Sequence, residues 1–481
     1  MSTPSTTAWT LHPDRALPSD PGVRSIAREL YTSVKDLPIV SMHGHVEAEA
    51  IFNNSPFGDP TELFVIPDHY LVRMLVSQGH TPDSLGLAPI DPASTLTPNA
   101  DHRAIWRTFC ANWKLYRGTP TRYWMEHELV EIFGITERPS AESADRIYDA
   151  LLAKLASDDF KMRALFDRFN IEVLATTDPA WSKLEYHHKL AEMGWGDRVL
   201  PTFRPDPLLH LCQPNWRADI DKLARASGVD ITSYPAYLEA LRAQRAYFIA
   251  AGARATDHGH LLADTTPLEA SVAARLFDVA LAGGEITAAQ EQAFSAHMLF
   301  QMAAMSADDG LVMQLHPGSL RNHDTKTLAT FGADKGYDIP IAMEYTRALR
   351  PVLEAFGHHP GFRMIAFTLD ENVYSRELSP LAGVYPALKL GAPWWFLDSP
   401  AGMRRFRETA TETAGFYNTT GFVDDTRAFA SIPARHDLAR RVDSGYLAQL
   451  VAEHRIDLDE ALETVADLTY HLPLASYAKR A

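Results

Sequence analysis

The segment Leu37-Pro-Ile-Val-Ser-Met-His-Gly-His-Val46 decides the fold and the chemistry that we expect of this chain. Its apolar, partly β-branched first half is typical of a buried strand, predicted at residues 38–42. His43 and His45 follow directly. Residues i and i+2 of an extended chain point to the same side, so both imidazoles can reach one metal ion. The segment therefore predicts part of a zinc or manganese site at the end of a strand.

Seven further apolar segments have the character of buried strands, and helical patterns separate most of them. These segments span residues 171–177, 198–203, 252–256, 310–316, 362–368, 389–396 and 420–423. Helical periodicity occurs between them, for example at 235–250 and 288–306. The alternation predicts an α/β fold, a (β/α)8 TIM-like barrel. An open doubly wound sheet is the alternative, although no Gly-x-Gly-x-x-Gly follows a strand.

The predicted organisation is one catalytic unit with a mostly helical insertion after the first strand. Residues 1–45 contain an N-terminal arm, a helix with Asp20 as its N-cap, and barrel strand one. Residues 46–170 lack a convincing buried strand and form the insertion, which carries Asp68-His69-Tyr70. Residues 171–481 supply the remainder of the barrel and the C-terminal helices.

Composition narrows the class of protein. Of 481 residues, 46% are hydrophobic and 22% are charged, as in ordinary globular enzymes. The net charge of −16 disfavours nucleic acid as a partner. Two distant cysteines, Cys110 and Cys212, argue against a disulfide scaffold. There is no signal-peptide pattern and no apolar run of membrane-spanning length, so we expect a cytoplasmic protein without a membrane partner.

In a barrel of this kind the active site lies where the strands end at their carboxyl side. The residues at those positions are unusually polar or aromatic, which favours a binding site over a solvated edge. They are His43, His45, Thr177, Asp178, Arg204, Asp257, His316, Arg321, Asp370, Glu371, Trp394, Trp395, Asp425 and Arg427.

Strands one and eight are neighbours in a closed barrel, so His43, His45 and Asp425 could ligate one ion, with His316 as a possible fourth ligand. This is the metal arrangement of the amidohydrolase superfamily. A second His-x-His pair, His258 and His260, follows a poor strand interior. A metal role is the alternative for that pair, but we favour hydrogen-bonded histidines near a surface loop.

Several motifs occur in one order along the chain. They are Leu37-Pro-Ile-Val with His43-Gly-His45, Asp68-His69-Tyr70, Leu174-Ala-Thr-Thr-Asp-Pro179, Arg198-Val-Leu-Pro-Thr-Phe-Arg-Pro-Asp206, Asp257-His-Gly259, Met313-Gln-Leu-His316, Trp394-Trp-Phe396 and Asp425-Thr-Arg427. On the basis of these motifs and their order, residues 22–478 resemble the uronate isomerase (glucuronate isomerase) family of the amidohydrolase superfamily. Gly44 and Val46 stand where that family usually has Cys and Leu, and Pro317 stands where it usually has Ile. These departures leave substrate identity open.

The resemblance implies an aldose–ketose isomerase that converts D-glucuronate to D-fructuronate and D-galacturonate to D-tagaturonate. It implies proton transfer through an enediol, one divalent ion (zinc or manganese), a small anionic sugar acid as ligand, and a homo-oligomer. The implied catalytic residues are Asp425, Tyr70, His69, Arg427 and Asp257; the implied substrate-binding residues are Arg204, Arg321, His316, Trp394, Trp395 and Arg427.

Several alternatives remain at this point. Asp425 and Tyr70 are both candidates for the base. The chain could be a metal-dependent hydrolase or decarboxylase of the same superfamily, a related isomerase acting on another sugar acid, or a non-catalytic sugar-acid sensor. The absence of a lysine near Asp257 weighs against the hydrolases, because two-metal members often carry a bridging lysine there.

Overall fold

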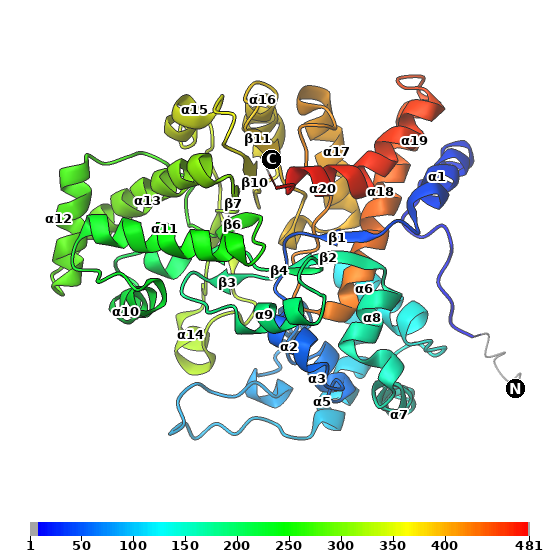
Figure 1. Cartoon of the computed structure of the whole chain (residues 1–481). Helices are drawn as coiled ribbons and strands as arrows, with labels where there is room; N and C mark the ends of the chain where they lie inside the picture. The colour runs from blue at the N-terminus through cyan, green and yellow to red at the C-terminus, as the bar shows by residue number, and fades with distance from the viewer. Residues whose placement is uncertain (1–7, 480–481) are drawn as a thin grey trace, which may run out of the picture.

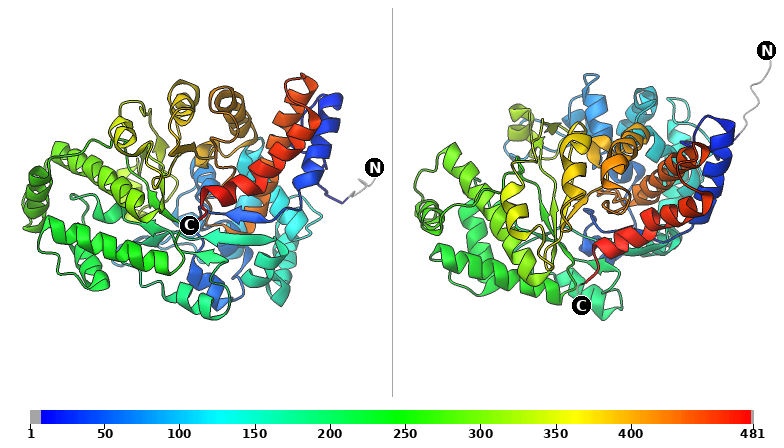
Figure 2. Two further views of the ribbon diagram at one scale, coloured as in Figure 1. Left: turned by 45° about the horizontal axis from the view of Figure 1, so that its top comes forward. Right: turned by 90° about the horizontal axis from the view of Figure 1, so that it is seen from above.

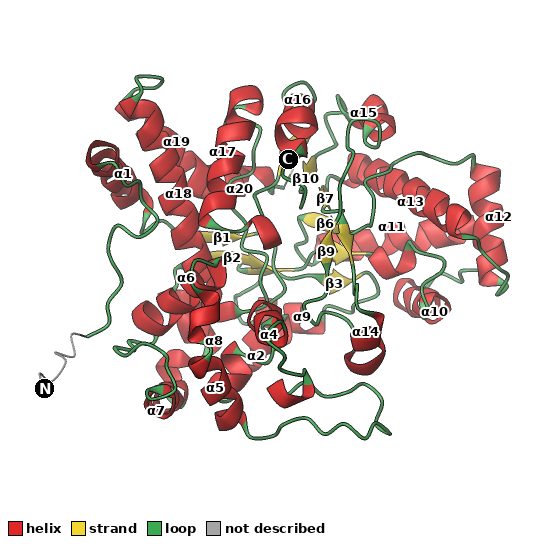
Figure 3. Cartoon of the chain, turned by 180° about the vertical axis from the view of Figure 1, so that it is seen from behind, coloured by secondary structure: helices red, strands yellow, loops and turns green. Residues whose placement is uncertain are grey.

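The computed structural model describes residues 8–479. Short parallel strands lie at its centre and helices surround them (Figure 1 and Figure 3). The strands are β1 (Ile39–Ser41), β2 (Ile171–Ala175), β3 (Asp178–Pro179), β4 (Val199–Leu200), β5 (Phe203–Arg204), β6 (Ala255–His258), β7 (Val312–Leu315), β8 (Ser319–Leu320), β9 (Ile339–Pro340), β10 (Met364–Ala366) and β11 (Leu388–Leu390).

The central strands form two parallel sheets, ordered β1-β2-β4 and β11-β10-β7-β6-β5-β3, and β8 pairs with β9 in a separate antiparallel ribbon. Residues 171–179 supply both β2 and β3, and residues 199–204 supply both β4 and β5, so two continuous segments connect the sheets. Each predicted strand segment except 420–423 overlaps a regular parallel strand. The architecture is a mixed α/β fold consistent with a TIM-like barrel.

The predicted eighth strand, residues 420–423, is not a regular strand. The reason is local: Gly421 within the segment has a φ of +74°, which an extended chain does not adopt, and Asp425 just beyond it has a φ of +42°. The segment nevertheless lies between β11 and the end of β1. The N–H of Thr420 donates to the carbonyl of Leu390 over 3.1 Å, and the N–H of Asp425 donates to that of His43 over 3.1 Å. Regular strands therefore do not close a complete ring within residues 8–479, although the backbone spans the gap.

The α-helices cover the outside of these strands (Figure 2). They are α1 (Pro21–Val34), α2 (Ala48–Asn53), α3 (Pro60–Phe64), α4 (His69–Val76), α5 (His102–Ala111), α6 (Pro120–His127), α7 (Ala144–Leu155), α8 (Met162–Arg168), α9 (Glu185–Glu192), α10 (Trp216–Ser227), α11 (Tyr234–Ala250), α12 (Ala270–Leu281), α13 (Ala288–Asp309), α14 (Thr325–Phe331), α15 (Arg350–Phe356), α16 (Ser379–Ala382), α17 (Pro400–Ala414), α18 (Ile432–Ala452), α19 (Leu458–Ala466) and α20 (Leu472–Ser476). The helices predicted at 235–250 and 288–306 are confirmed as α11 and α13.

Every regular element described between β1 and β2 is helical, in agreement with the predicted character of residues 46–170. These helices do not have a separate core. Trp106 and Phe109 of α5 are buried in one cluster with Ile39 of β1 and Ile171 of β2. The division of the chain into domains stays a prediction.

The N-terminal region packs against the C-terminal helices. The Asp20 carboxylate accepts hydrogen bonds from the first turn of α1, as predicted for an N-cap. The buried face of α1 shares a core with α18 and α19, beside which it lies in Figures 1 and 2. The described part of the arm is also packed. Trp9 is buried, and its backbone N–H donates to the carbonyl of Thr136 over 2.8 Å. Residues 1–7 of the predicted arm lie outside the described chain. Across residues 8–479, no helix combines the length and apolar character needed to cross a membrane.

Candidate active site

Predicted functional side chains converge at the carboxyl ends of the parallel strands. His43 and His45 follow β1, Arg204 ends β5, Asp257 lies near the end of β6, and His316 follows β7. The strand predicted at 252–256 is shifted toward the C-terminus in the structure. Its predicted start, Gly252, has a φ of +102° and still belongs to the turn after α11, so the strand begins at residue 255.

His43, His45 and Asp425 meet at one point. Oδ1 of Asp425 lies 2.9 Å from Nε2 of His45 and 3.3 Å from Nε2 of His43. Burial alone would raise the pKa of Asp425, but hydrogen bonds from the two imidazoles hold that pKa well below its usual range. The ligand atoms of His43, His45 and Asp425 lie within 4.8 Å of one another. Two imidazole nitrogens with a carboxylate oxygen suit zinc or manganese. These residues therefore fit the predicted ion, whose identity the donor set does not decide.

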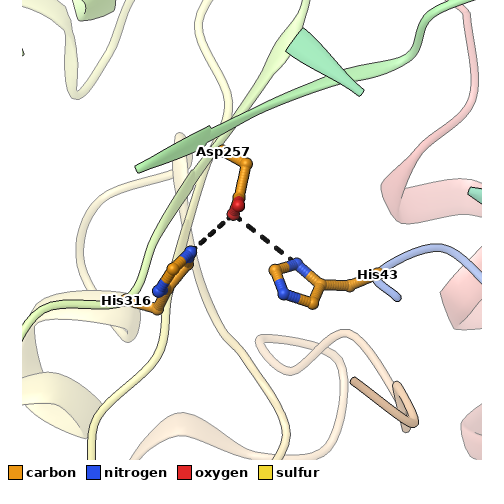
Figure 4. A group of neighbouring side chains, drawn as sticks. All are labelled: His43, Asp257 and His316. Atoms are coloured by element: carbon orange, nitrogen blue, oxygen red, sulfur yellow. Dashed lines mark hydrogen bonds and ion pairs between the residues drawn. The ribbon is translucent and has the colours of Figure 1, made fainter. Parts of the chain in front are cut away.

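Asp257 is fully buried and joins a second group of side chains (Figure 4). Its Oδ1 lies 2.6 Å from Nε2 of His316 and 3.7 Å from Nδ1 of His43, and its Oδ2 lies 3.3 Å from Nη1 of Arg204. Burial would raise the pKa of Asp257, but the charges of His316, Arg204 and His43 hold it well below its usual range. His316 thus binds Asp257, and its role as a fourth metal ligand stays a prediction.

His43 is held by both ring nitrogens. Its Nδ1 donates to Oε1 of Gln314 over 3.0 Å, and the same oxygen accepts from the Tyr477 hydroxyl over 2.7 Å. A metal-binding histidine needs such a partner behind it, because the hydrogen bond orients the ring. Burial would lower the pKa of His43, but Asp257 and Asp425 raise it to about 9. The field at His43 therefore favours positive charge. No role was predicted for Gln314, and no motif or periodicity in the sequence pointed to Tyr477.

A cavity of about 500 Å³ opens above these groups. Most of the predicted site residues line it, whereas His43 and Asp257 lie beneath its wall. The predicted residues among its lining are His45, His69, Tyr70, Arg204, His316, Arg321, Trp394, Trp395, Asp425 and Arg427. Other lining residues had no assigned function in the sequence, among them Trp181, Asp334 and Asp338.

A family model described as glucuronate isomerase matches residues 23–476. The chain belongs to the glucuronate isomerase family. It is 52% identical to a uronate isomerase of Brucella suis, covering 97% of this chain and 99% of that one. A crystal structure of glucuronate isomerase from Caulobacter crescentus matches with a TM-score of 0.95 and 51% identity over 98% of both chains. That of a uronate isomerase from Thermotoga maritima matches with a TM-score of 0.90 and 28% identity, over 98% of this chain and all of that one.

In this glucuronate isomerase family member, carboxylates hold the three cavity arginines for which a role was predicted. Nε of Arg204 donates to Asp206 over 3.1 Å, in addition to the contact with Asp257. Nη1 of Arg321 donates to Asp338 over 2.9 Å, and its guanidinium lies 4.8 Å from the Trp395 ring centroid. Arg427 makes a longer contact of 3.4 Å to Asp334, and 48% of its side chain is exposed. Arg204 and Arg321 are therefore positioned firmly, and Arg427 is the most accessible.

Tyr70 and His69 differ in what they can do with a proton. Burial raises the pKa of Tyr70, so its phenol stays protonated at neutral pH. Burial, together with the charges of Arg427 and Arg73, lowers the pKa of His69 to about 4, so its imidazole is neutral there. Tyr70 can donate a hydrogen bond but is a poor base.

Besides His43 and Asp257, the strand-end residues Asp178, Asp370 and Glu371 do not line the cavity. Asp178 accepts the Thr176 hydroxyl over 2.6 Å. Asp370 accepts the N–H of Met343 over 3.0 Å, and Glu371 pairs with Arg405 over 2.9 Å. Both contacts stabilise loops. The polar character that singled these two residues out in the sequence therefore reflects loop structure.

Proposed function

We propose that this chain is a uronate isomerase that interconverts a hexuronate aldose and its ketose through an enediol, as with D-glucuronate and D-fructuronate or D-galacturonate and D-tagaturonate. The observation that carries the proposal is the placement of arginines on the wall of one cavity beside a two-histidine, one-aspartate donor set, of which His45 and Asp425 line the cavity and His43 lies beneath its wall. Its volume of about 500 Å³ lies within the range of small-molecule sites.

The arginines bind the acid end of the substrate. A planar guanidinium presents paired donors that match a carboxylate. Arg204 and Arg321 are rigid because Asp206, Asp257 and Asp338 hold them, and each still lines the cavity. Because the two guanidinium groups are fixed, they also fix the position of the sugar acid, so that C1 and C2 lie near the carboxylate of Asp425. Indole rings of Trp394 and Trp395 supply the apolar wall.

The reaction moves one proton from C2 to C1 and one from the C2 oxygen to the C1 oxygen. A divalent ion held by His43, His45 and Asp425 would polarise a substrate oxygen. Asp425 removes the C2 proton and returns it to C1, because Tyr70 is protonated and unsuited to this role. Tyr70 donates a hydrogen bond to the developing enediolate oxygen, which is usually a large contribution to rate. The neutral imidazole of His69 passes the proton between the two oxygens.

The test is incubation of the purified protein with D-glucuronate and with D-galacturonate, followed by NMR and mass spectrometry. We expect a ketose of unchanged mass from at least one of them. Loss of mass would indicate a decarboxylase, and binding without turnover would indicate a sensor. Asp425→Asn is the inactive control. It keeps the shape of the side chain but removes the base and a charged metal ligand together, so it should turn over neither sugar.

A further inference from the structure

A third group of side chains consists of Asp206, which lines the cavity, and two buried histidines, His258 and His260. Asp206 follows β5, His258 is the last residue of β6, and His260 lies two residues further on. The two histidine side chains are 0% and 2% exposed. Both histidines are therefore interior residues, in contrast to the surface-loop histidines predicted from the sequence.

The three side chains direct one atom each at a common point. Oδ1 of Asp206 lies 3.9 Å from Nδ1 of His258 and 3.9 Å from Nε2 of His260. All three atoms lie within 4.8 Å of one another. Each of them is buried and has no hydrogen-bond partner among the described residues. Buried polar atoms without partners are rare, and three that face one another require an explanation.

The outward atoms of the same side chains are all engaged. Nε2 of His258 lies 3.0 Å from Oγ1 of Thr256, and Nδ1 of His260 lies 2.9 Å from Oγ of Ser295. Oδ2 of Asp206 accepts the N–H of Gly259 over 2.8 Å and Nε of Arg204 over 3.1 Å. When the outward nitrogens carry the ring protons, the inward atoms present two imidazole lone pairs and a carboxylate oxygen to one another. Such a set repels itself unless a cation lies between its members, and outward hydrogen bonds of this kind typically support metal ligands.

We propose that Asp206, His258 and His260 form a second divalent-metal site, separate from that of His43, His45 and Asp425. Two imidazole nitrogens and one carboxylate oxygen are ligands for zinc and related transition metals. Tetrahedral zinc with bonds of about 2.0–2.2 Å places its ligand atoms roughly 3.3–3.6 Å apart. The two Asp206–histidine distances of 3.9 Å reach that spacing by closing a few tenths of an ångström.

The ion has a positioning role. It fixes Oδ1 of Asp206, whose Oδ2 holds Arg204, and so it stabilises the orientation of a guanidinium in the cavity wall. This consequence rests on the proposed function of Arg204. The metal site itself does not, and metal binding is therefore the primary measurement.

The experiment strips the full-length protein with a chelator and titrates it with Zn²⁺ alone, with bound zinc counted by mass spectrometry and calorimetry. Wild type should bind two equivalents, and His260→Gln and His258→Gln should each bind one fewer. His45→Gln should keep the second site. The matched control is His297→Gln: His297 is buried, but Tyr234 and the Leu268 N–H occupy both of its nitrogens, so the zinc count should equal that of wild type.

Equal zinc content in His258→Gln, His260→Gln and wild type would overturn the proposal. If the first site bound no zinc, the counts of wild type, His258→Gln, His260→Gln and His297→Gln would each fall by one and that of His45→Gln would not change. The difference between wild type and His260→Gln would persist, so the two assignments fail separately. If the variants do not fold, anomalous scattering at the zinc edge from wild-type crystals decides. A peak between Asp206, His258 and His260 supports the site, and its absence at saturating zinc refutes it.

Discussion

His43 and Asp425 are joined twice. The backbone N–H of Asp425 donates to the carbonyl of His43 over 3.1 Å, and Nε2 of His43 lies 3.3 Å from Oδ1 of Asp425. The backbone contact holds the segment after β11 against the end of β1, and the side-chain contact aligns two donor atoms. Donor groups fixed in this way need no rearrangement to receive an ion, which favours tight binding.

Loss of one donor should therefore empty this site. We expect His43→Ala to bind one equivalent of divalent metal fewer than wild type, because only His45 and Asp425 remain to hold the ion. Elemental analysis of both proteins, purified in parallel, measures this. His297→Ala is the control for removal of a buried imidazole and should keep the wild-type content. Equal metal in His43→Ala and wild type would remove His43 from the ligand set.

Arg204→Lys should not behave as a conservative change. The guanidinium contacts Asp206 and Asp257 at once, and a lysine ammonium cannot reproduce that fork. We expect kcat/KM on the preferred uronate to fall by roughly 10²-fold, the size of effect produced by a small misplacement in a site. Steady-state kinetics on uronates and on neutral aldoses will show a loss of preference for the acids. Unchanged kcat/KM would assign Arg204 a structural role only.

Gly259→Ala should displace Arg204 and His316, two residues of the cavity wall. A Cβ at this position would lie 2.9 Å from Nη2 of Arg204 and 2.9 Å from Cε1 of His316, so both groups must move. We expect a loss in kcat/KM of roughly 10²-fold, with a circular dichroism spectrum like that of wild type.

Gly44→Ala is the matched control for Gly259→Ala. Its Cβ would meet nothing nearer than 3.5 Å, although it lies between His43 and His45. Its activity should stay close to that of wild type. Similar losses in both variants would show that any methyl group near the strand ends impairs the enzyme, and would refute the specific clash.

His297 should make stability depend on pH. Its Nδ1 accepts the Leu268 N–H over 3.0 Å, and burial lowers its pKa from 6.5 to about 4. The unfolded chain binds a proton at His297 more readily than the folded chain does. The contribution of the neutral, buried His297 to the free energy of unfolding is therefore complete above pH 6.5 and is lost as pH falls toward 4. Urea unfolding at pH 7.5 and 4.5 should show that wild type loses up to about 3 kcal/mol more than His297→Gln. Identical pH dependence in the two proteins would contradict this.

Solvent hydrogen should enter the product. If Asp425 carries the proton between C2 and C1, a reaction in D2O places deuterium at C1 of the ketose, and at C2 of the aldose in reverse. NMR after many turnovers measures the exchange, because a shielded base can retain the proton for a few cycles. Complete retention of the substrate hydrogen at long times would exclude the enediol route and support a hydride shift.

Local features of the sequence were sufficient for much of the scaffold. The β-branched run before His43 predicts a strand, and a spacing of two predicts that His43 and His45 approach the same partner, as both do at Asp425. Asp20 before Pro21 predicts the start of α1. Each of these inferences compares residues within one segment, where backbone geometry sets which side chains share a face.

Only the tertiary structure decided which segments meet. Asp257 joins His316, Arg204 and His43 from three other segments, and no periodicity in the sequence records such a contact. His258 and His260 looked like loop residues because Gly252 and its neighbours are poor strand formers, yet pairing with β7 extends β6 to residue 258 and buries both. Long-range packing of the sheets, rather than local propensity, brings these side chains close enough to form hydrogen bonds or to ligate one ion.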